Sequence, residues 1–250
     1  MSELSRLVLG LQAVRECLRA HGSEVRVLLA DQRSGGPAKG DVAALAALAR
    51  FARDQGATVE SVPRSQLDHL SRGTRHQGAA AYAAPLSLVR FDPEDADLPK
   101  DALVVALDEL EDPQNFGASI RSAVGFGASY IIFPESHAAP LTPSTFRASA
   151  GAVEHAKLSR TPNLVDTIEQ AKAAGFKVVG LDANATAAIA SADLRGRTMM
   201  VVGAEGKGLR KPVKSACSEL VRLPMVGPVA SLNASAALAI ALYEVTRQRA

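Results

Sequence analysis

Short apolar runs alternate with segments of helical period along most of the chain, and this alternation constrains the fold more than any other feature. Apolar runs such as Leu103–Asp108 and Thr198–Gly203 are typical of strands that are buried on both faces of a sheet. Strands that alternate with helices indicate an α/β fold with a mainly parallel sheet. In the second half of the chain we expect strands at 103–108, 130–134, 176–182, 198–203 and 219–224, and helices at 116–125, 164–174 and 232–247.

A smaller α/β pattern comes first and ends near Pro85. We expect its strands at 7–10, 24–30, 58–62 and 79–84, and its helices at 11–20, 41–55 and 65–70. The stretch that follows, 86–100, is rich in charged and turn-forming residues and has little periodicity. The sequence therefore predicts a small α/β domain at 1–85, a linker at 86–100 and a larger α/β domain at 101–250.

The composition excludes several classes of protein. Hydrophobic residues make up 47% of the 250 residues, enough to bury a core, but no apolar run approaches the roughly 20 residues of a membrane helix. The N-terminus lacks the pattern of a secretion signal. We therefore expect a cytoplasmic protein that does not enter a membrane. A net charge of +2 does not by itself indicate a nucleic-acid partner.

The cysteines and histidines do not form a metal-binding pattern. Cys17 and Cys217 are far apart and lie in apolar helical patterns, so we expect free, buried thiols. The five histidines lack the spacing of metal ligands. No metal is expected.

Three polar segments of the second domain carry the candidate chemistry, and the first is 112–123. Its helix is expected to start at Asn115, a favourable N-cap residue. Gly117, Arg121 and Gly125 are spaced four apart, which would leave space around the guanidinium group on one helix face. The spacing alone fits equally well a capped helix with a solvated arginine.

The second segment, 201–210, is an apolar run that enters a glycine-rich loop. Loops of this kind allow backbone N–H groups to surround a nucleotide-like ligand, although a simple tight turn has the same composition. The spacing of Gly203, Gly206 and Gly208 matches neither the dinucleotide-binding nor the triphosphate-binding motif. Glu205 could accept hydrogen bonds from the loop or from a ligand. The basic residues beyond it, which could contact phosphate or simply be solvated, are Lys207, Arg210, Lys211 and Lys214.

The third segment, 223–235, contains a Gly/Pro-rich loop and the start of an alanine-rich helix. Ser231 and Asn233 are plausible helix caps, which is the simplest explanation for both. The small residues that follow would allow the last helix to pack closely against other backbone.

Taken in this order and at these distances, the three segments resemble the motifs of the SpoU/TrmH family of SPOUT methyltransferases. The motifs correspond to Asp108–Arg121, Met200–Arg210 and Leu223–Ser235. The resemblance extends over the first domain, where Leu9–Val14 looks like the start of the family's RNA-binding extension.

The resemblance implies a fold and an assembly that the spacing does not. It implies a C-terminal SPOUT domain with a mainly parallel sheet, in which the chain after about Gly196 forms a trefoil knot, preceded by a small L30e-like domain. It also implies a homodimer with the active site near the subunit interface. Knots are rare exceptions among protein folds, so residue patterns alone would not have predicted one.

The resemblance also implies a reaction: methyl transfer from S-adenosylmethionine to the 2′-hydroxyl of a guanosine in 23S rRNA, with no metal. By position it assigns catalytic or substrate-positioning roles to Asn115, Arg121, Glu205, Ser231 and Asn233, and donor binding to Gly203, Ala204, Glu205, Gly206, Met225, Gly227 and Leu232. Arginine ordinarily stays protonated, so Arg121 would act as a base only if its charge were suppressed. Otherwise it would stabilise the alkoxide as a cation.

Three alternatives stay open. The same chemistry could act on another rRNA nucleotide, such as the adenosine modified by related antibiotic-resistance enzymes, or on tRNA. A non-catalytic RNA-binding protein of ribosome assembly is a second alternative, disfavoured because Arg121, Glu205 and Asn233 are present. A nucleotide-binding oxidoreductase is a third, disfavoured because the expected glycine motif is missing. The sequence does not identify the modified nucleotide, nor whether free rRNA or an assembly particle is the substrate.

Overall fold

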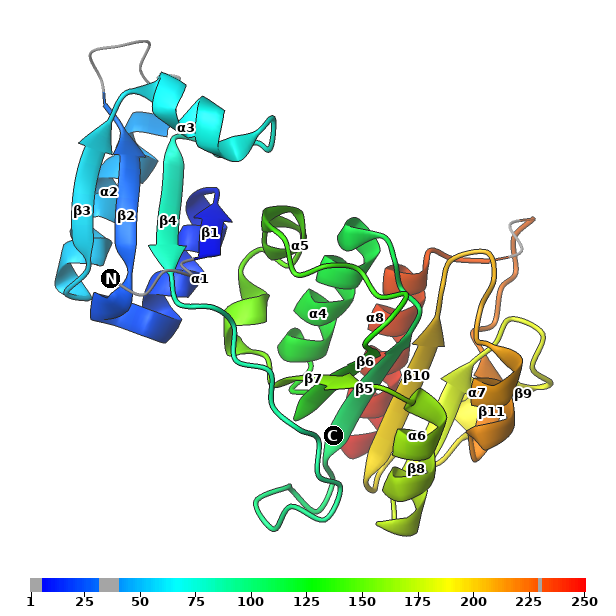
Figure 1. Ribbon diagram of the computed structural model, residues 1–250. Helices are drawn as coiled ribbons and strands as arrows, with labels where there is room; N and C mark the ends of the chain where they lie inside the picture. Colours follow the sequence, from blue (N-terminus) through cyan, green and yellow to red (C-terminus); the bar gives the residue numbers. More distant parts are fainter. Residues whose placement is uncertain (1–5, 32–40, 229–230) are drawn as a thin grey trace. The chain divides into compact units, whose positions relative to one another are not determined.

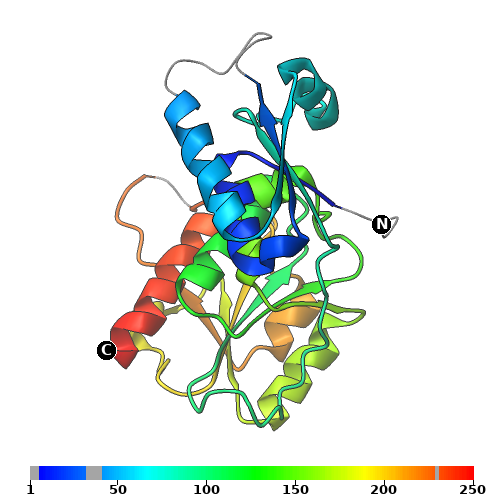
Figure 2. The same ribbon diagram turned by 90° about the vertical axis from the view of Figure 1, so that its left-hand side faces the viewer.

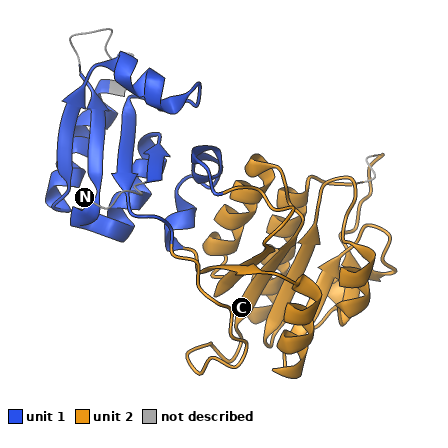
Figure 3. Cartoon of the chain, in the orientation of Figure 1, with its two compact units in different colours: residues 1–86, 141–155 blue, residues 87–140, 156–250 orange. Residues whose placement is uncertain are grey.

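The computed structural model describes residues 6–31, 41–228 and 231–250. The chain divides into two compact units, which Figure 3 shows in different colours. Unit 1 comprises Met1–Leu86 together with Leu141–His155, and unit 2 comprises Ser87–Pro140 together with Ala156–Ala250. Unit 1 is therefore discontinuous in sequence.

Unit 1 contains a four-stranded sheet in the order β1-β4-β2-β3 (Figure 1). β4 runs antiparallel to β1 and β2, while β2 and β3 are parallel. Apolar residues of α1 and α2 pack on one face of the sheet, and Leu67 of α3 packs on the other. The elements are β1 (Arg6–Leu9), α1 (Leu11–His21), β2 (Arg26–Ala30), α2 (Asp41–Asp54), β3 (Thr58–Val62), α3 (Arg64–Ser71) and β4 (Ala79–Ala83).

The segment Leu141–His155 joins unit 1 through buried charges. It forms α5 (Pro143–Ala148) and a short 3-10 helix (Ala152–His155), neither of which the sequence pattern predicted. The fully buried Glu154 carboxylate accepts a hydrogen bond from Nη1 of Arg6 at 2.6 Å and lies 2.9 Å from Nε2 of His21. A second pair joins Nε2 of His155 to Glu16 at 3.0 Å. These residues are more than 130 positions apart in the chain, so the contacts join the two sequence parts of unit 1.

Replacing Glu154 by glutamine is expected to lower the free energy of unfolding by about 3 kcal/mol, because it leaves the nearly buried Arg6 guanidinium without its counter-charge. The measurement is urea unfolding at pH 7 followed by circular dichroism. The matched control is Glu60→Gln, which breaks the exposed pair with Arg26 and should leave the unfolding midpoint unchanged. Equal midpoints for the two variants would contradict the structural role of Glu154.

Unit 2 contains a seven-stranded sheet in the order β7-β6-β5-β10-β8-β11-β9, and every pairing is parallel. The predicted α/β class with a mainly parallel sheet is confirmed. The strands are β5 (Leu103–Asp108), β6 (Tyr130–Pro134), β7 (Leu158–Thr161), β8 (Lys177–Leu181), β9 (Ala187–Ala188), β10 (Thr198–Gly203) and β11 (Glu219–Arg222). The helices are α4 (Pro113–Gly125), α6 (Leu164–Ala173), α7 (Lys211–Ala216) and α8 (Ala234–Arg249).

Helices cover both faces of this sheet. Alternate residues of β5, such as Val104 and Ala106, pack in one cluster with Ile168 of α6 and Val213 of α7. On the other face α8 packs against α4 and β10, and Figures 1 and 2 both show the two helices side by side. Phe116 of α4 stacks edge-on against Phe133 of β6, with ring centroids 5.1 Å apart. Because β5, β10 and β8 are neighbouring parallel strands of this sheet, their carboxyl ends lie side by side at one edge.

The stretch predicted as a linker, 86–100, packs partly on unit 2. Phe91 and Leu98 are buried in its core, and Leu88 pairs with Leu158 at the edge of the sheet. Phe91 stacks edge-on against Tyr130, with ring centroids 5.2 Å apart. At least part of this stretch is thus an ordered flank of unit 2.

The start of α4 corrects one prediction. Asp112, and not Asn115, is the N-cap residue, and its carboxylate accepts hydrogen bonds from the backbone N–H groups of Gln114 (3.1 Å) and Asn115 (3.2 Å). Pro113 occupies the first helical position, where its missing N–H has no consequence. The Asn115 side chain is consequently available for other contacts.

The end of the chain is anchored to the segment that precedes β10. The Gln248 side chain bonds with the backbone of Leu194 and Ala192, at 3.0 and 3.1 Å. The Arg249 guanidinium donates to the carbonyl groups of Asp101, Leu194 and Gly196. The path from β10 through α7 and β11 to α8 is the stretch on which the resemblance predicts a knot. None of the described helices is long and apolar enough to span a membrane.

Candidate functional site

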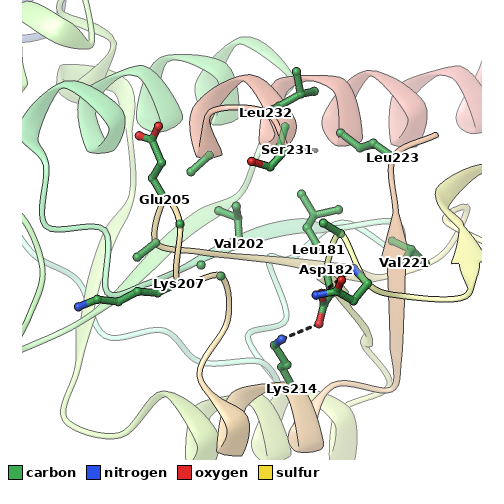
Figure 4. A pocket seen from close by; sticks show the side chains of 18 of the residues that line it. Leu181, Asp182, Val202, Glu205, Lys207, Lys214, Val221, Leu223, Ser231 and Leu232 are labelled. Carbon is green, nitrogen blue, oxygen red and sulfur yellow. Dashed lines mark hydrogen bonds and ion pairs between the residues drawn. The ribbon is translucent and has the colours of Figure 1, made fainter. Parts of the chain in front are cut away.

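A pocket opens at the carboxyl ends of β8, β10 and β11, where ligands commonly bind in parallel α/β sheets. Its empty volume is about 910 Å³ when the adjoining open solvent space is included. Figure 4 shows its side chains from close by. The lining residues are Leu181, Asp182, Ala183, Asn184, Val202, Gly203, Ala204, Glu205, Gly206, Lys207, Gly208, Lys214, Val221, Leu223, Met225, Ser231, Leu232, Ala234 and Ala237.

The glycine-rich loop after β10 forms one side of the pocket and folds tightly back on itself. The backbone N–H of Gly208 donates to the carbonyl group of Ala204 at 2.8 Å, and Gly206 and Gly208 have positive φ angles of 75° and 65°. A Cβ atom on Gly203 would lie 2.2 Å from the carbonyl carbon and oxygen of Gly208. Only glycine is compatible with this approach of backbone to backbone.

A cluster of two amides and one carboxylate joins the three sequence segments. Nδ2 of Asn115 donates to Oε2 of Glu205 at 2.9 Å. Nδ2 of Asn233 donates to Oδ1 of Asn115 at 2.6 Å and lies 3.3 Å from Oε2 of Glu205. Asn233 is also the N-cap of α8, because its Oδ1 accepts from the backbone N–H of Ser235 at 3.0 Å. The amide–carboxylate cluster is exposed and borders the pocket through Glu205.

Arg121 lies on the exposed surface of α4 and is not a lining residue of the pocket. Within the described parts of this chain its guanidinium has no hydrogen-bond or ion-pair partner. Gly117, expected beside it on an open face, is buried, whereas Gly125 has open space around it. The structure therefore brings together Asn115, Glu205 and Asn233, and leaves Arg121 outside their cluster.

Two of the basic residues expected to contact phosphate are already paired within the protein. Arg210 donates from its backbone N–H (2.9 Å) and from Nε (2.7 Å) to the fully buried carboxylate of Asp108. Hydrogen bonding to Asp108 raises the pKa of Arg210. This contact ties the end of the glycine loop to β5, while Lys214 pairs with Asp182. Lys207 and Lys211 are exposed.

Six of the seven predicted donor-binding residues line the pocket. Ser231 also lines it, whereas Gly227 does not. The predicted donor-binding residues that line the pocket are Gly203, Ala204, Glu205, Gly206, Met225 and Leu232. Sequence reasoning did not assign the segment after β8 to the site. This segment forms the opposite wall together with Lys214 of α7, which the sequence had indicated only as a possible phosphate contact. The signal for it was Asp182, the polar end of a predicted strand.

No metal site accompanies the pocket. Within residues 6–31, 41–228 and 231–250, no group of three or more His, Cys, Asp or Glu side chains could hold a metal ion. Both cysteines are free, and burial raises the pKa of the thiols of Cys17 and Cys217 to about 12 and 11, so neither is a reactive thiolate. The arrangement thus defines an α/β domain with a pocket for a small ligand at its strand ends, beside a polar cluster able to orient a second reactant.

Comparison with known proteins identifies the family to which this domain belongs. Residues 102–243 match the SpoU rRNA Methylase family, and residues 7–89 match a domain described as RNA 2'-O ribose methyltransferase substrate binding. The first match covers more than half of the chain. The chain therefore belongs to the SpoU rRNA methylase family and is an RNA methyltransferase.

Individual relatives agree with this assignment. A putative TrmH family tRNA/rRNA methyltransferase, YacO of Bacillus subtilis, is 37% identical over 100% of this chain and 98% of its own length. An AdoMet-bound rRNA methyltransferase from Sinorhizobium meliloti superposes with a TM-score of 0.74 at 25% identity, covering 97% of this chain and 87% of its own. The A. aeolicus TrmH/SpoU tRNA modifying enzyme, 26% identical with a TM-score of 0.54, covers 61% of this chain and 77% of its own.

Proposed function

We propose that this methyltransferase transfers a methyl group from S-adenosylmethionine to the ribose 2′-hydroxyl of a guanosine in 23S rRNA. The observation that carries the proposal is the amide–carboxylate cluster of Asn115, Glu205 and Asn233 beside the pocket. The rRNA target is favoured over tRNA because the rRNA methyltransferase from S. meliloti matches nearly the whole chain, whereas the A. aeolicus tRNA enzyme matches only 61% of it. We place the enzyme in the cytoplasm, where its substrate is made.

The pocket fits a nucleoside-like methyl donor. Val202, Val221, Leu223 and Leu232 offer apolar contact to a flat base, while the glycine loop exposes backbone groups where side chains would otherwise intrude. The donor supplies an electrophilic methyl group on a sulfonium centre that leaves as a neutral thioether, so a metal is not required. The residues that would hold it are Gly203, Ala204, Glu205, Gly206, Met225 and Leu232, with Gly227 a further candidate from the family resemblance.

The residues around the pocket would orient the ribose of the substrate RNA. Asn115 and Asn233 fix the Glu205 carboxylate through their amide groups, and this fixed carboxylate can accept a hydrogen bond from a hydroxyl group of the incoming nucleotide. Ser231, which lines the pocket, offers a further hydroxyl to the substrate. Arg121 would help to remove the proton of the 2′-hydroxyl group, or would stabilise the alkoxide that develops as this proton leaves.

We further propose that the enzyme is a homodimer that pairs through α8. Ile240 and Tyr243, three residues apart on α8, are 46% and 59% exposed, an apolar pair that a second copy would cover. The exposed Arg121 would then reach a site completed by the partner. The double variant Ile240→Asp/Tyr243→Asp is expected to be monomeric in light scattering and to lose methyl transfer. A dimeric and active double variant would contradict this interface.

The function is tested by incubating the full chain with methyl-labelled S-adenosylmethionine and, in parallel, unmodified 23S rRNA fragments, 16S rRNA and tRNA. We expect label as 2′-O-methylguanosine in the 23S rRNA fragments. Label only in tRNA, or on an adenosine, would overturn the target and keep the chemistry. A protein that does not bind the donor would overturn the enzyme assignment at this pocket.

A further inference from the structure

The wall of the pocket opposite the glycine loop carries a charged pair that no assigned role explains. Asp182 follows directly after β8, and its side chain is only 10% exposed. Nζ of Lys214, on α7, lies 2.6 Å from Oδ2 of Asp182, and the backbone N–H of Asn184 donates to Oδ1 at 2.9 Å. Figure 4 shows the pair among the residues that line the pocket.

The Asp182 carboxylate has acceptor capacity to spare. An ionised carboxylate offers about four lone-pair positions. Within the described chain, Lys214 uses one, the backbone N–H of Asn184 uses another, and the Asn184 side chain also interacts with the carboxylate. The hydrogen bond from Lys214 lowers the pKa of Asp182, so the group is an anion at neutral pH and acts only as an acceptor. About one or two acceptor positions therefore remain for a ligand in the pocket.

The other lining residues limit which part of a ligand can contact the Asp182 carboxylate. Asp182 and Glu205 are the two carboxylates of the pocket, and Glu205 is already bound by Asn115 and Asn233. Most of the remaining lining residues are aliphatic or glycine, and they provide an apolar surface against which a nucleobase can pack. Asp182 is thus the anionic acceptor on the wall opposite Glu205, where it can meet a polar group of the ligand.

We propose that Asp182, held in place by Lys214, binds the 2′- and 3′-hydroxyl groups of the ribose of the methyl donor. This proposal rests on the proposed function. A vicinal diol offers two donors side by side, and one carboxylate can accept from both. The adenine amino group fits less well, because the carboxylate would also face the lone pair of the neighbouring ring nitrogen N1. Carboxylates bind ribose hydroxyls in the same way in other nucleotide sites at the ends of parallel strands.

The experiment compares two ligands on the full chain by isothermal titration calorimetry: S-adenosylhomocysteine and its 2′,3′-dideoxy analogue. The wild type is expected to bind the analogue on the order of 10- to 100-fold more weakly, as hydrogen bonds to a charged group imply. Asp182→Asn and Asp182→Ala should weaken S-adenosylhomocysteine by a similar factor and leave the analogue nearly unaffected, so that the ratio between the ligands approaches one. The matched control is Asp193→Asn, an exposed carboxylate outside the pocket, which should retain the wild-type ratio.

The ratio separates this proposal from the function on which it rests. If wild type binds both ligands equally, or if the Asp182 variants keep the wild-type ratio, Asp182 does not bind the ribose although the donor site stands. If wild type binds neither ligand, the donor site itself is wrong and this proposal fails with it. The comparison of ligands on wild type needs no variant, so poor folding of a variant would not prevent the test.

Discussion

Replacing Arg121 by lysine is expected to reduce methyl transfer to RNA by a factor on the order of 10² to 10³, while the affinity for S-adenosylhomocysteine stays within about twofold of wild type. Lysine keeps the charge but loses the planar fork of donors that can bind a ribose oxygen and a phosphate together. Donor affinity should be preserved because Arg121 does not line the pocket. The measurements are single-turnover methyl transfer and calorimetry.

The matched control for this prediction is Arg195→Lys, which alters an exposed arginine beside Asp193 and outside the pocket. It should leave both turnover and donor affinity unchanged. Turnover of Arg121→Lys at the wild-type rate would remove Arg121 from the mechanism. A parallel loss of donor affinity would instead show that α4 positions the pocket as a whole.

Replacing Gly203 by alanine is expected to weaken donor binding at least tenfold and to lower the melting temperature. The added Cβ would stand 2.2 Å from the carbonyl group of Gly208 and 2.4 Å from the backbone nitrogen of Leu209. Backbone cannot rotate away as a side chain can, so the loop must shift, and overpacking of this kind costs about 1 to 3 kcal/mol or more. The loop also lines the pocket, so its movement changes the donor site directly.

The matched control is Gly196→Ala, because a Cβ atom at Gly196 meets nothing within 4 Å and its φ is not positive. Calorimetry with S-adenosylhomocysteine and thermal unfolding should show a near-wild-type protein. Wild-type donor affinity in Gly203→Ala would show that the loop adapts without consequence, and would exclude it as a rigid wall of the pocket.

The buried strands of unit 2 were predictable from sequence because most of them read as continuous apolar runs between turns. β5 and β10 were predicted at their observed bounds. β7, β9, α5 and α7 were missed because β7 is not an apolar run, β9 has only 2 residues, and helices of 6 residues show too little of the helical period. The cap of α4 was misplaced by three residues. Pro113, a favoured first helical residue, was the signal that pointed to Asp112.

The candidate site was predictable only where the family resemblance reached. The motif residues Asn115, Glu205 and Asn233 were named, but their mutual hydrogen bonds follow from packing between residues 28 to 118 positions apart. Asp182 lay outside the motifs. Its place on the pocket depends on β8 standing between β10 and β11 in the sheet, an order that does not follow the sequence.

The discontinuity of unit 1 changes how the enzyme can be dissected. A truncation at residue 85 would not remove an intact module, because it would leave Glu154 without Arg6 and His21, and His155 without Glu16. The remaining segment, Leu141–His155, would then expose unpaired charges and apolar surface, and both would affect an RNA-binding assay. A clean excision has to delete Leu141–His155 as well and rejoin Pro140 to Ala156. Grafting unit 1 onto another methyltransferase likewise requires two insertions, because its two sequence parts are separated by a segment of unit 2.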